Sequence, residues 1–309
     1  MKMKKLRMLL LATLALCACS SGGDGAGDSP GVPNPPTGDK RQPINIGMTV
    51  NDRENTRVTD LAFEVGDQIG LFVVNRNADG TAQALKTTGN HVDNMRFTYN
   101  ATWTPDAPIY WLDDKTNADF YIYYPYTATV ADVAAMPFSV NADQSAEAAY
   151  KAGDVIIGSR TNVAPTEAAV MINAHHAMSQ LLITLVPGNG FTEETLAAAE
   201  VSVRVNGVKT NATINLAAAT VTAVGDISSV TPLKAGDAYK ALIVPQTVAE
   251  GNLLTVTVDG REYNLVRGLT FESGKRYNCT VVLSKTSEGV NVTIGDWDDD
   301  GTDYGGTAE

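Results

Sequence analysis

Apolar and polar residues alternate along much of the chain, with the period of two that a half-buried β-strand shows. The first such stretch covers residues 44–50, where Ile44, Ile46, Met48 and Val50 would share one face. Stretches of the same period follow at residues 63–65, 69–73, 201–205, 254–258, 263–265 and 277–283. The pattern therefore predicts a mainly β protein.

Two denser apolar runs are expected to form buried strands. Phe120–Tyr124 is aromatic and β-branched and ends at Pro125. Leu181–Val186 is continuously apolar, which suits a strand buried on both faces. In the last alternating stretch Cys279 shares a face with Tyr277, so we expect it to be a small buried apolar residue rather than a reactive thiol.

Turn and helix signals separate these strands. Gly66-Asp67, Asn206-Gly207 and Asp259-Gly260 are typical of tight turns, the last two of hairpins. A short helix is predicted over 145–153, with Ser145 as its N-cap and Gly153 just past its end. A second short, alanine-rich helix is predicted to open at Thr192-Glu193-Glu194, where acidic residues favour the helix dipole.

Short strands with frequent turns and mostly antiparallel signals predict two β-sandwich domains in series. The boundary is expected near residues 174–178, giving an N-terminal sandwich over 44–175 and a C-terminal sandwich over 176–297. Residues 19–43 read as a flexible tether, because Ser, Gly, Asp, Pro and Thr dominate them. Residues 298–309 read as an acidic tail.

The first residues predict export. A basic start and a short apolar run over 1–18 form a signal peptide that is too short to span a bilayer. Leu16-Cys17-Ala18-Cys19 has the form of a lipobox, so Cys19 is the predicted lipidation site and palmitate one of its acyl chains. The alternative is a soluble secreted protein whose signal happens to end in cysteine.

Charge and cysteine content narrow the function classes. The formal net charge is −12, and removal of residues 1–18 takes away basic residues only. An acidic chain without a basic patch is not expected to bind nucleic acid. Once the signal is removed and Cys19 acylated, Cys279 is the remaining thiol, so no intramolecular disulfide is predicted.

Several phrases together resemble the fimbrillin family of Bacteroidales, the FimA/Mfa-like pilus lipoproteins. They are residues 66–72 (GDQIGLF), 123–126 (YYPY), 154–158 (DVIIG), 176–181 (HAMSQL), 243–247 (IVPQT) and 271–277 (FESGKRY). The resemblance covers residues 44–297. It implies two transthyretin-like β-sandwich domains and a lipoprotein precursor carried to the outer membrane.

The resemblance also implies an assembly route by strand exchange. The chain would be clipped after Arg53 or Arg57, the first strand over 44–50 would leave, and the last strand of another subunit would fill the groove. The donor strand residues would be Val290, Val292, Ile294 and Trp297. Partners would be other fimbrillin subunits, with surface glycans or proteins as candidate adhesion ligands. The family includes stalk, anchor and tip proteins, which the sequence does not separate.

Metal and cofactor sites are not expected. Asp296–Gly301 matches the first half of an EF-hand loop, but Thr307 stands where a bidentate Glu is needed, so a solvated acidic tail is preferred. Adjacent His175 and His176 point to opposite strand faces and lack a third ligand nearby, since His91 is the one other histidine.

No nucleophile elbow, zinc-protease motif or phosphate loop occurs, so the protein is not expected to be an enzyme, although a sugar hydrolase with two dispersed carboxylates stays open. Trp103, Tyr110 and Trp111 could stack on a sugar but are read as core residues. The leading hypothesis is a structural and adhesion subunit of a surface pilus. Its rival is a monomeric surface lipoprotein that binds glycans through loops.

Overall fold

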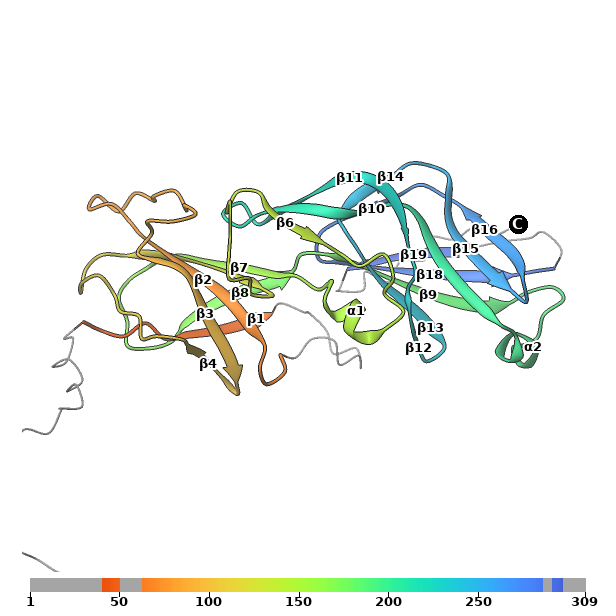
Figure 1. Ribbon diagram of the computed structural model, residues 1–309, viewed down its shortest axis with the longest axis horizontal. Coiled ribbons are helices and arrows are strands. Elements are labelled where there is room, and N and C mark those ends of the chain that lie inside the picture. The colour runs from red at the N-terminus through yellow and green to blue at the C-terminus, as the bar shows by residue number, and fades with distance from the viewer. Residues whose placement is uncertain (1–40, 51–62, 286–290, 297–309) are drawn as a thin grey trace, which may run out of the picture. The chain divides into compact units, whose positions relative to one another are not determined.

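The computed structural model describes residues 41–50 and 63–285, and the backbone of 291–296. Strands dominate these residues and two short helices accompany them, which confirms the predicted mainly β class (Figure 1). The first sheet contains β1 (Ile46–Val50), β2 (Gln68–Asn75), β3 (Val92–Asn100), β4 (Thr102–Pro105), β5 (Ala118–Tyr124), β7 (Ile156–Val163) and β8 (Val170–His176).

This seven-stranded sheet has the order β1-β8-β7-β5-β2-β3-β4. Its pairs are antiparallel except for β1 with β8, which run parallel. β2 is buried on both faces: Ile69 and Leu71 join one apolar cluster, and Phe72 and Val74 join another. The centre of the sheet is therefore covered on both sides, whereas β1 and β4 form its edges.

The remaining strands form a sandwich with two layers (Figure 1). One layer has the order β11-β10-β15-β16 and the other β12-β13-β9-β18-β19, while β14 and β17 pair separately. Their bounds are β9 (Ser179–Pro187), β10 (Val201–Asn215), β11 (Thr220–Val230), β12 (Leu233–Ala235), β13 (Ala238–Ile243), β14 (Gln246–Val248), β15 (Asn252–Val258), β16 (Arg261–Val266), β17 (Leu269–Phe271), β18 (Lys275–Leu283) and β19 (Asn291–Asp296). Leu181 and Ile183 from one layer and Val203 and Val256 from the other meet in a shared core.

A third group of buried residues takes members from both halves of the chain. It joins Phe72 and Tyr123 of the first sheet with Ala212 and Leu242. β6 (Met136–Ser139) pairs with β10, although it precedes the expected boundary near residue 175. The predicted division into 44–175 and 176–297 stays a prediction.

Both predicted helices exist, but the N-cap residue predicted for the first helix was wrong. α1 covers Glu147–Lys151, its N-cap residue is Ala146, and no side chain caps it. Ser145 instead gives its backbone N–H to Asp143, which holds it in the preceding loop. α2 (Glu193–Ala198) begins as predicted, with Thr192 as N-cap in a capping box. No helix among the described residues is long and apolar enough to cross a membrane.

Two local predictions were wrong and two were confirmed. Asn206-Gly207 is not a hairpin turn, because β10 runs straight through it with a bulge at Gly207, whose φ is +73°. Val65 is exposed in a turn rather than placed in a strand. The turns at 66–67 and 259–260 are present, the latter joining β15 to β16.

β9 departs from its expectation in part. Leu181 and Ile183 are buried on the inner face, whereas Leu182 and Val186 are only half-buried. The continuous apolar run therefore overstated the burial of the outer face of β9.

Candidate functional site

β1 is the described element that the assembly hypothesis depends on, and it lies at an edge of the seven-stranded sheet. It pairs in parallel with β8 over five positions, from Ile46 opposite Val170 to Val50 opposite Ala174. The backbone N–H of Val170 donates to the carbonyl of Asn45 at 2.8 Å. Only β8 pairs with β1 among the described residues, so its second edge carries no ladder there.

The chain just before β1 is fixed by a short antiparallel contact. The N–H of Ile44 donates to the carbonyl of Ile109 at 2.9 Å, and that of Trp111 to the carbonyl of Gln42 at 2.9 Å. Pro43 faces Tyr110 in this bridge. Residues 42–50 are therefore held from two directions, by the segment around residue 110 and by β8.

The side chains of β1 and of the residues just before it alternate as the sequence predicts. Ile44 and Ile46 are buried, Met48 and Val50 are half-buried, and these four pack against the core of the first sheet. Val170 and the other inward residues of β8 belong to the same core. Each fully buried isoleucine contributes roughly 1.5–3 kcal/mol relative to an exposed one. Loss of this strand would uncover an apolar trough beside an unpaired strand edge.

The outer face of β1 is lightly covered. Thr49 donates from Oγ1 to Oδ1 of Asn173 at 3.0 Å in an exposed pair. A Cβ on Gly47 would meet the sulfur of Met171, whose side chain is 48% exposed. The strand is thus held mainly from its inner face and by one ladder.

Residues after β1 carry the predicted processing site. Arg53 and Arg57 lie outside the described residues, as does the predicted lipidation site Cys19. The description resumes at Phe63, whose ring packs edge-on against Trp103 at 4.9 Å and against Tyr124 at 5.7 Å.

The predicted donor strand is described in part. Val292 and Ile294 lie on β19, an edge strand that pairs with β18, opposite Cys279 and Tyr277 respectively. Val290 and Trp297 lie outside the described residues. The chain thus has its first and last described strands at sheet edges, one in each half.

The structure confirms the expected burial of Cys279. The thiol is 2% exposed on the inward face of β18 with Tyr277 and Val281, and desolvation raises its pKa to about 12. A thiol held protonated in this way is a poor nucleophile.

The two adjacent histidines lie at the end of β8 and face different surroundings. His176 is buried, and its Nδ1 lies 2.7 Å from Oδ1 of Asp154, whereas His175 is half-buried. Burial lowers the pKa of His175, and its neighbour His176 lowers it further. Within the described residues, no cluster of three or more His, Cys, Asp or Glu side chains could hold a metal.

Of the three candidate stacking aromatics, Trp111 is a core residue as expected. It is 1% exposed, packs edge-on against Phe120 at 5.5 Å, and donates from Nε1 to the carbonyl of Thr166 at 3.3 Å. Trp103 is half-buried in an aromatic group with Phe63, and Tyr110 is half-buried beside residue 43.

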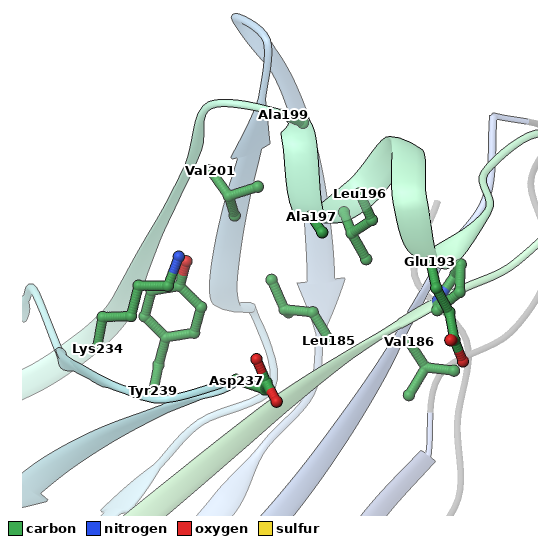
Figure 2. Close-up of a pocket in the computed structure, with 11 residues that line it drawn as sticks. Leu185, Val186, Glu193, Leu196, Ala197, Ala199, Val201, Lys234, Asp237 and Tyr239 are labelled. Carbon is green, nitrogen blue, oxygen red and sulfur yellow. The ribbon is translucent and has the colours of Figure 1, made fainter.

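A pocket of about 440 Å³ lies beneath α2 (Figure 2). Leu185, Leu196 and Val201 converge on it, and the ammonium of Lys234 lies 5.8 Å from the ring centroid of Tyr239. Asp237 and Glu193 add carboxylates to the lining. No residue of α2 is buried, so the helix covers the end of the sandwich loosely. The pocket suits an apolar group, and its sequence neighbourhood gave no sign of it.

One edge-protecting residue was also missed. Gln144 is fully buried and its side-chain amide bonds both backbone groups of Leu242, accepting from the N–H at 2.8 Å and donating to the carbonyl at 2.8 Å. β12 pairs with β13 only at residues 238–240, so at Leu242 the amide acts in place of a neighbouring strand on that side. Nothing in the surrounding sequence marks this role.

Comparison with known proteins agrees with this architecture. The fimbrillin-like family model matches residues 56–297. A Bacteroides uniformis protein named as a fimbrium subunit, Fim1C, is 29% identical over 310 residues, covering 96% of each chain. A Bacteroides ovatus protein named as a fimbrium tip subunit is 28% identical over 178 residues, which is 52% of this chain and 31% of that one.

Solved structures share the fold. A crystal structure described as a cell adhesion protein of Bacteroides uniformis covers 82% of this chain and 99% of its own, with 22% identity and a TM-score of 0.62. Another so described, from Bacteroides ovatus, covers 84% and 98%, with 16% identity and a TM-score of 0.66. The family match spans most of the chain, and this protein belongs to the fimbrillin-like family.

Proposed function

We propose that this protein is a structural and adhesion subunit of a surface fimbrium, exported as a lipoprotein anchored through Cys19 and assembled by strand exchange. Membership in the fimbrillin-like family and the similarity to a named fimbrium subunit support the fimbrial role and a cell-surface location. Its main partners are other fimbrial subunits. The observation that carries the assembly step is the seating of β1 at a sheet edge.

β1 has the properties that an exchangeable strand needs. It pairs with one neighbour, and its apolar side chains occupy one face. An incoming strand with the same period of two could form the same ladder on β8 and fill the same apolar positions. In the proposed reaction, cleavage after Arg53 or Arg57 cuts the covalent link that keeps residues 44–50 in place.

The donor is the last strand of a second subunit, with Val290, Val292, Ile294 and Trp297 as its apolar positions. β19 pairs only with β18 among the described residues. Its departure therefore uncovers one edge of its own sheet and leaves the ladder between β9 and β18 intact. Both exchanging strands are edge strands, so neither transfer requires a sheet to be split.

Cleavage followed by polymerisation is the direct test. The full chain is treated with a trypsin-like protease, and the product is followed by size-exclusion chromatography and electron microscopy. Clipped protein should form rods slowly while uncut protein stays monomeric. The double variant Arg53→Ala and Arg57→Ala should resist clipping, and removal of residues 288–309 should give clipped monomers that do not extend.

Two outcomes would contradict the proposal. Monomers that persist at high concentration after verified loss of residues 44–50 would refute strand exchange. A Cys19→Ala variant that remains acylated and in the membrane fraction would refute the anchor at Cys19, whereas its release as unacylated protein is the expected result.

A further inference from the structure

A polar cavity of about 340 Å³ lies where β2 ends, and no residue of β1 or β19 lines it. It is formed by the last residues of β2, the loop that leads into β3, and Leu112. The lining residues are Val74, Asn75, Arg76, Gln83, Ala84, Lys86, Gly89, Asn90, His91 and Leu112. Its volume falls within the usual range of small-ligand sites, roughly 300–1,000 Å³.

The charge of this lining is opposite to that of the protein. The whole chain carries a formal net charge of −12, yet the cavity is lined by Arg76, Lys86 and His91 and by no carboxylate. Arg76 is compensated, because its Nε donates to the buried Asp119 at 2.8 Å. The ammonium of Lys86 is exposed and forms no ion pair with any described residue. The cavity therefore offers one uncompensated permanent positive charge.

Hydrogen bonds hold the loop around this charge in place. Asn90 accepts from the N–H of Lys86 at 3.0 Å and donates to the carbonyl of Lys86 at 2.6 Å. Asp93 accepts from the N–H groups of Gly89 and Asn90, at 2.7 and 3.0 Å. Asp79, the carboxylate within the loop, accepts from the N–H and the hydroxyl of Thr81, at 2.9 and 2.6 Å. Both carboxylates are thus occupied by donors of the loop itself, and the loop is organised before any ligand arrives.

The remaining lining can bind hydroxyl groups and an apolar ring face. The Gln83 side chain is exposed and its amide has no bonded partner among the described residues. Asn75 also lines the cavity, and its Oδ1 is buried without a hydrogen-bond partner, so the lining contains an unused acceptor. Leu112 is 46% exposed and offers an apolar surface at the same cavity.

We infer that this cavity binds an acidic sugar unit, a hexuronic or sialic acid residue of a surface glycan. One free positive charge matches one carboxylate, the amides match ring hydroxyls, and Leu112 matches the apolar face of the ring. A phosphate dianion would call for more positive charge than Lys86 supplies, because Arg76 is already paired. The inference stands independently of strand exchange, since it uses no residue of β1 or β19.

The test is a binding titration of the full chain by calorimetry or ligand-observed NMR. The probes are methyl glucuronoside, the methyl glycoside of N-acetylneuraminic acid, methyl glucoside and inorganic phosphate. One of the two acidic sugars should bind at millimolar concentration or better, and methyl glucoside, which lacks the carboxylate, should not. The acidic sugar that binds identifies the class of glycan.

Two lysine variants test whether the acidic sugar binds in this cavity. Lys86→Gln should weaken binding roughly ten- to hundredfold, the usual loss for one charge-assisted hydrogen bond. Lys115→Gln removes the same charge from another exposed lysine that does not line the cavity, and it should leave binding unchanged. Both lysines are exposed, so both variants should keep the thermal midpoint of the parent chain.

Several outcomes would overturn the inference. They are no binding of either acidic sugar, equal binding of methyl glucoside, phosphate binding as tight as that of the sugar, or equal losses in the Lys86 and Lys115 variants. The last result would indicate attraction by the general surface field rather than a site in the cavity.

Discussion

Replacing Ile46 by alanine should loosen β1 without unfolding the rest of the protein. Ile46 is 7% exposed and packs into the core of the first sheet, so truncation removes buried methyl and methylene groups and leaves a cavity. Such substitutions cost about 2–5 kcal/mol in well-packed cores, and the lower part of this range, about 2–4 kcal/mol, suits an edge strand that can relax. This loss of free energy should weaken the pairing of β1 with β8.

Native-state hydrogen exchange can measure this loss directly. The amide of Val170 donates to the carbonyl of Asn45, so it exchanges when β1 leaves. A loss of about 2–4 kcal/mol corresponds to roughly 30- to 700-fold faster exchange at Val170, while the amide of Ile183 in the second half should change far less.

Thr49→Ala on the same strand is the matched control. It removes an exposed hydrogen bond to Asn173 and should cost at most about 1 kcal/mol. Equal acceleration at Val170 and Ile183 in the Ile46 variant would refute the view of β1 as a separable unit. An unchanged exchange rate at Val170 would refute the view that buried apolar side chains hold β1 on the sheet.

Three further predictions concern the core. Cys279 should resist thiol reagents in the folded protein, and Cys279→Ser should lower the free energy of unfolding by about 1–3 kcal/mol in a denaturant titration, because it buries a hydroxyl. Gln144→Ala should cost about 1–3 kcal/mol in the same assay, since both backbone groups of Leu242 lose their partner, and a smaller loss would mean that water replaces the amide. Burial raises the pKa of Tyr123 to about 12 and that of Cys279 to about 12. The contribution of these groups to the free energy of unfolding should therefore be full below about pH 9 and fall as the pH rises toward 12. Phenolate absorbance that follows the free-tyrosine curve while the fold persists would contradict this prediction.

The elements that sequence could predict are those in which side-chain periodicity alone decides the outcome. The period of two placed Cys279 on the inward face of β18 and Ile44 and Ile46 on the inward face of the first strand. The start of α2 at Thr192 was predictable because the acidic residues of its first turn are a local signal. These features depend on residues a few positions apart, so no knowledge of the tertiary structure is needed.

Predictions failed where a distant partner decides between two local structures. Asn206-Gly207 supplies the positive φ that both a hairpin turn and a bulge require. The bulge forms because β10 continues past Gly207, where it pairs with β11, the next strand along the chain, and with β6, which lies far earlier in the sequence. Ser145 lost its expected cap role for a nearer reason, since Asp143 captures its N–H.

The sequence also did not predict which strands pair in parallel. Ile46 of β1 lies opposite Val170 of β8, and Gln180 of β9 lies opposite Arg276 of β18, so each pair joins strands that are far apart along the chain. The structure explains why one position in the segments that resemble fimbrillins is a glycine. A Cβ on Gly158 of β7 would lie 2.6 Å from the carbonyl oxygen of Asn173, so a side chain there would force β7 and β8 apart.

The position of β1 in the sheet order bears on function more than its sequence pattern does. Alternation predicted a strand over 44–50, but a strand in the middle of a sheet cannot leave without breaking two ladders. β1 contributes one ladder of five positions and a row of inward apolar side chains, so its departure costs one set of contacts and leaves β8 paired with β7. The vacated edge then presents unpaired backbone groups and an apolar trough together, and an extended segment with alternating apolar residues satisfies both requirements. We therefore propose that an edge strand held in this way is stable in the intact chain and becomes replaceable once its covalent link is cut.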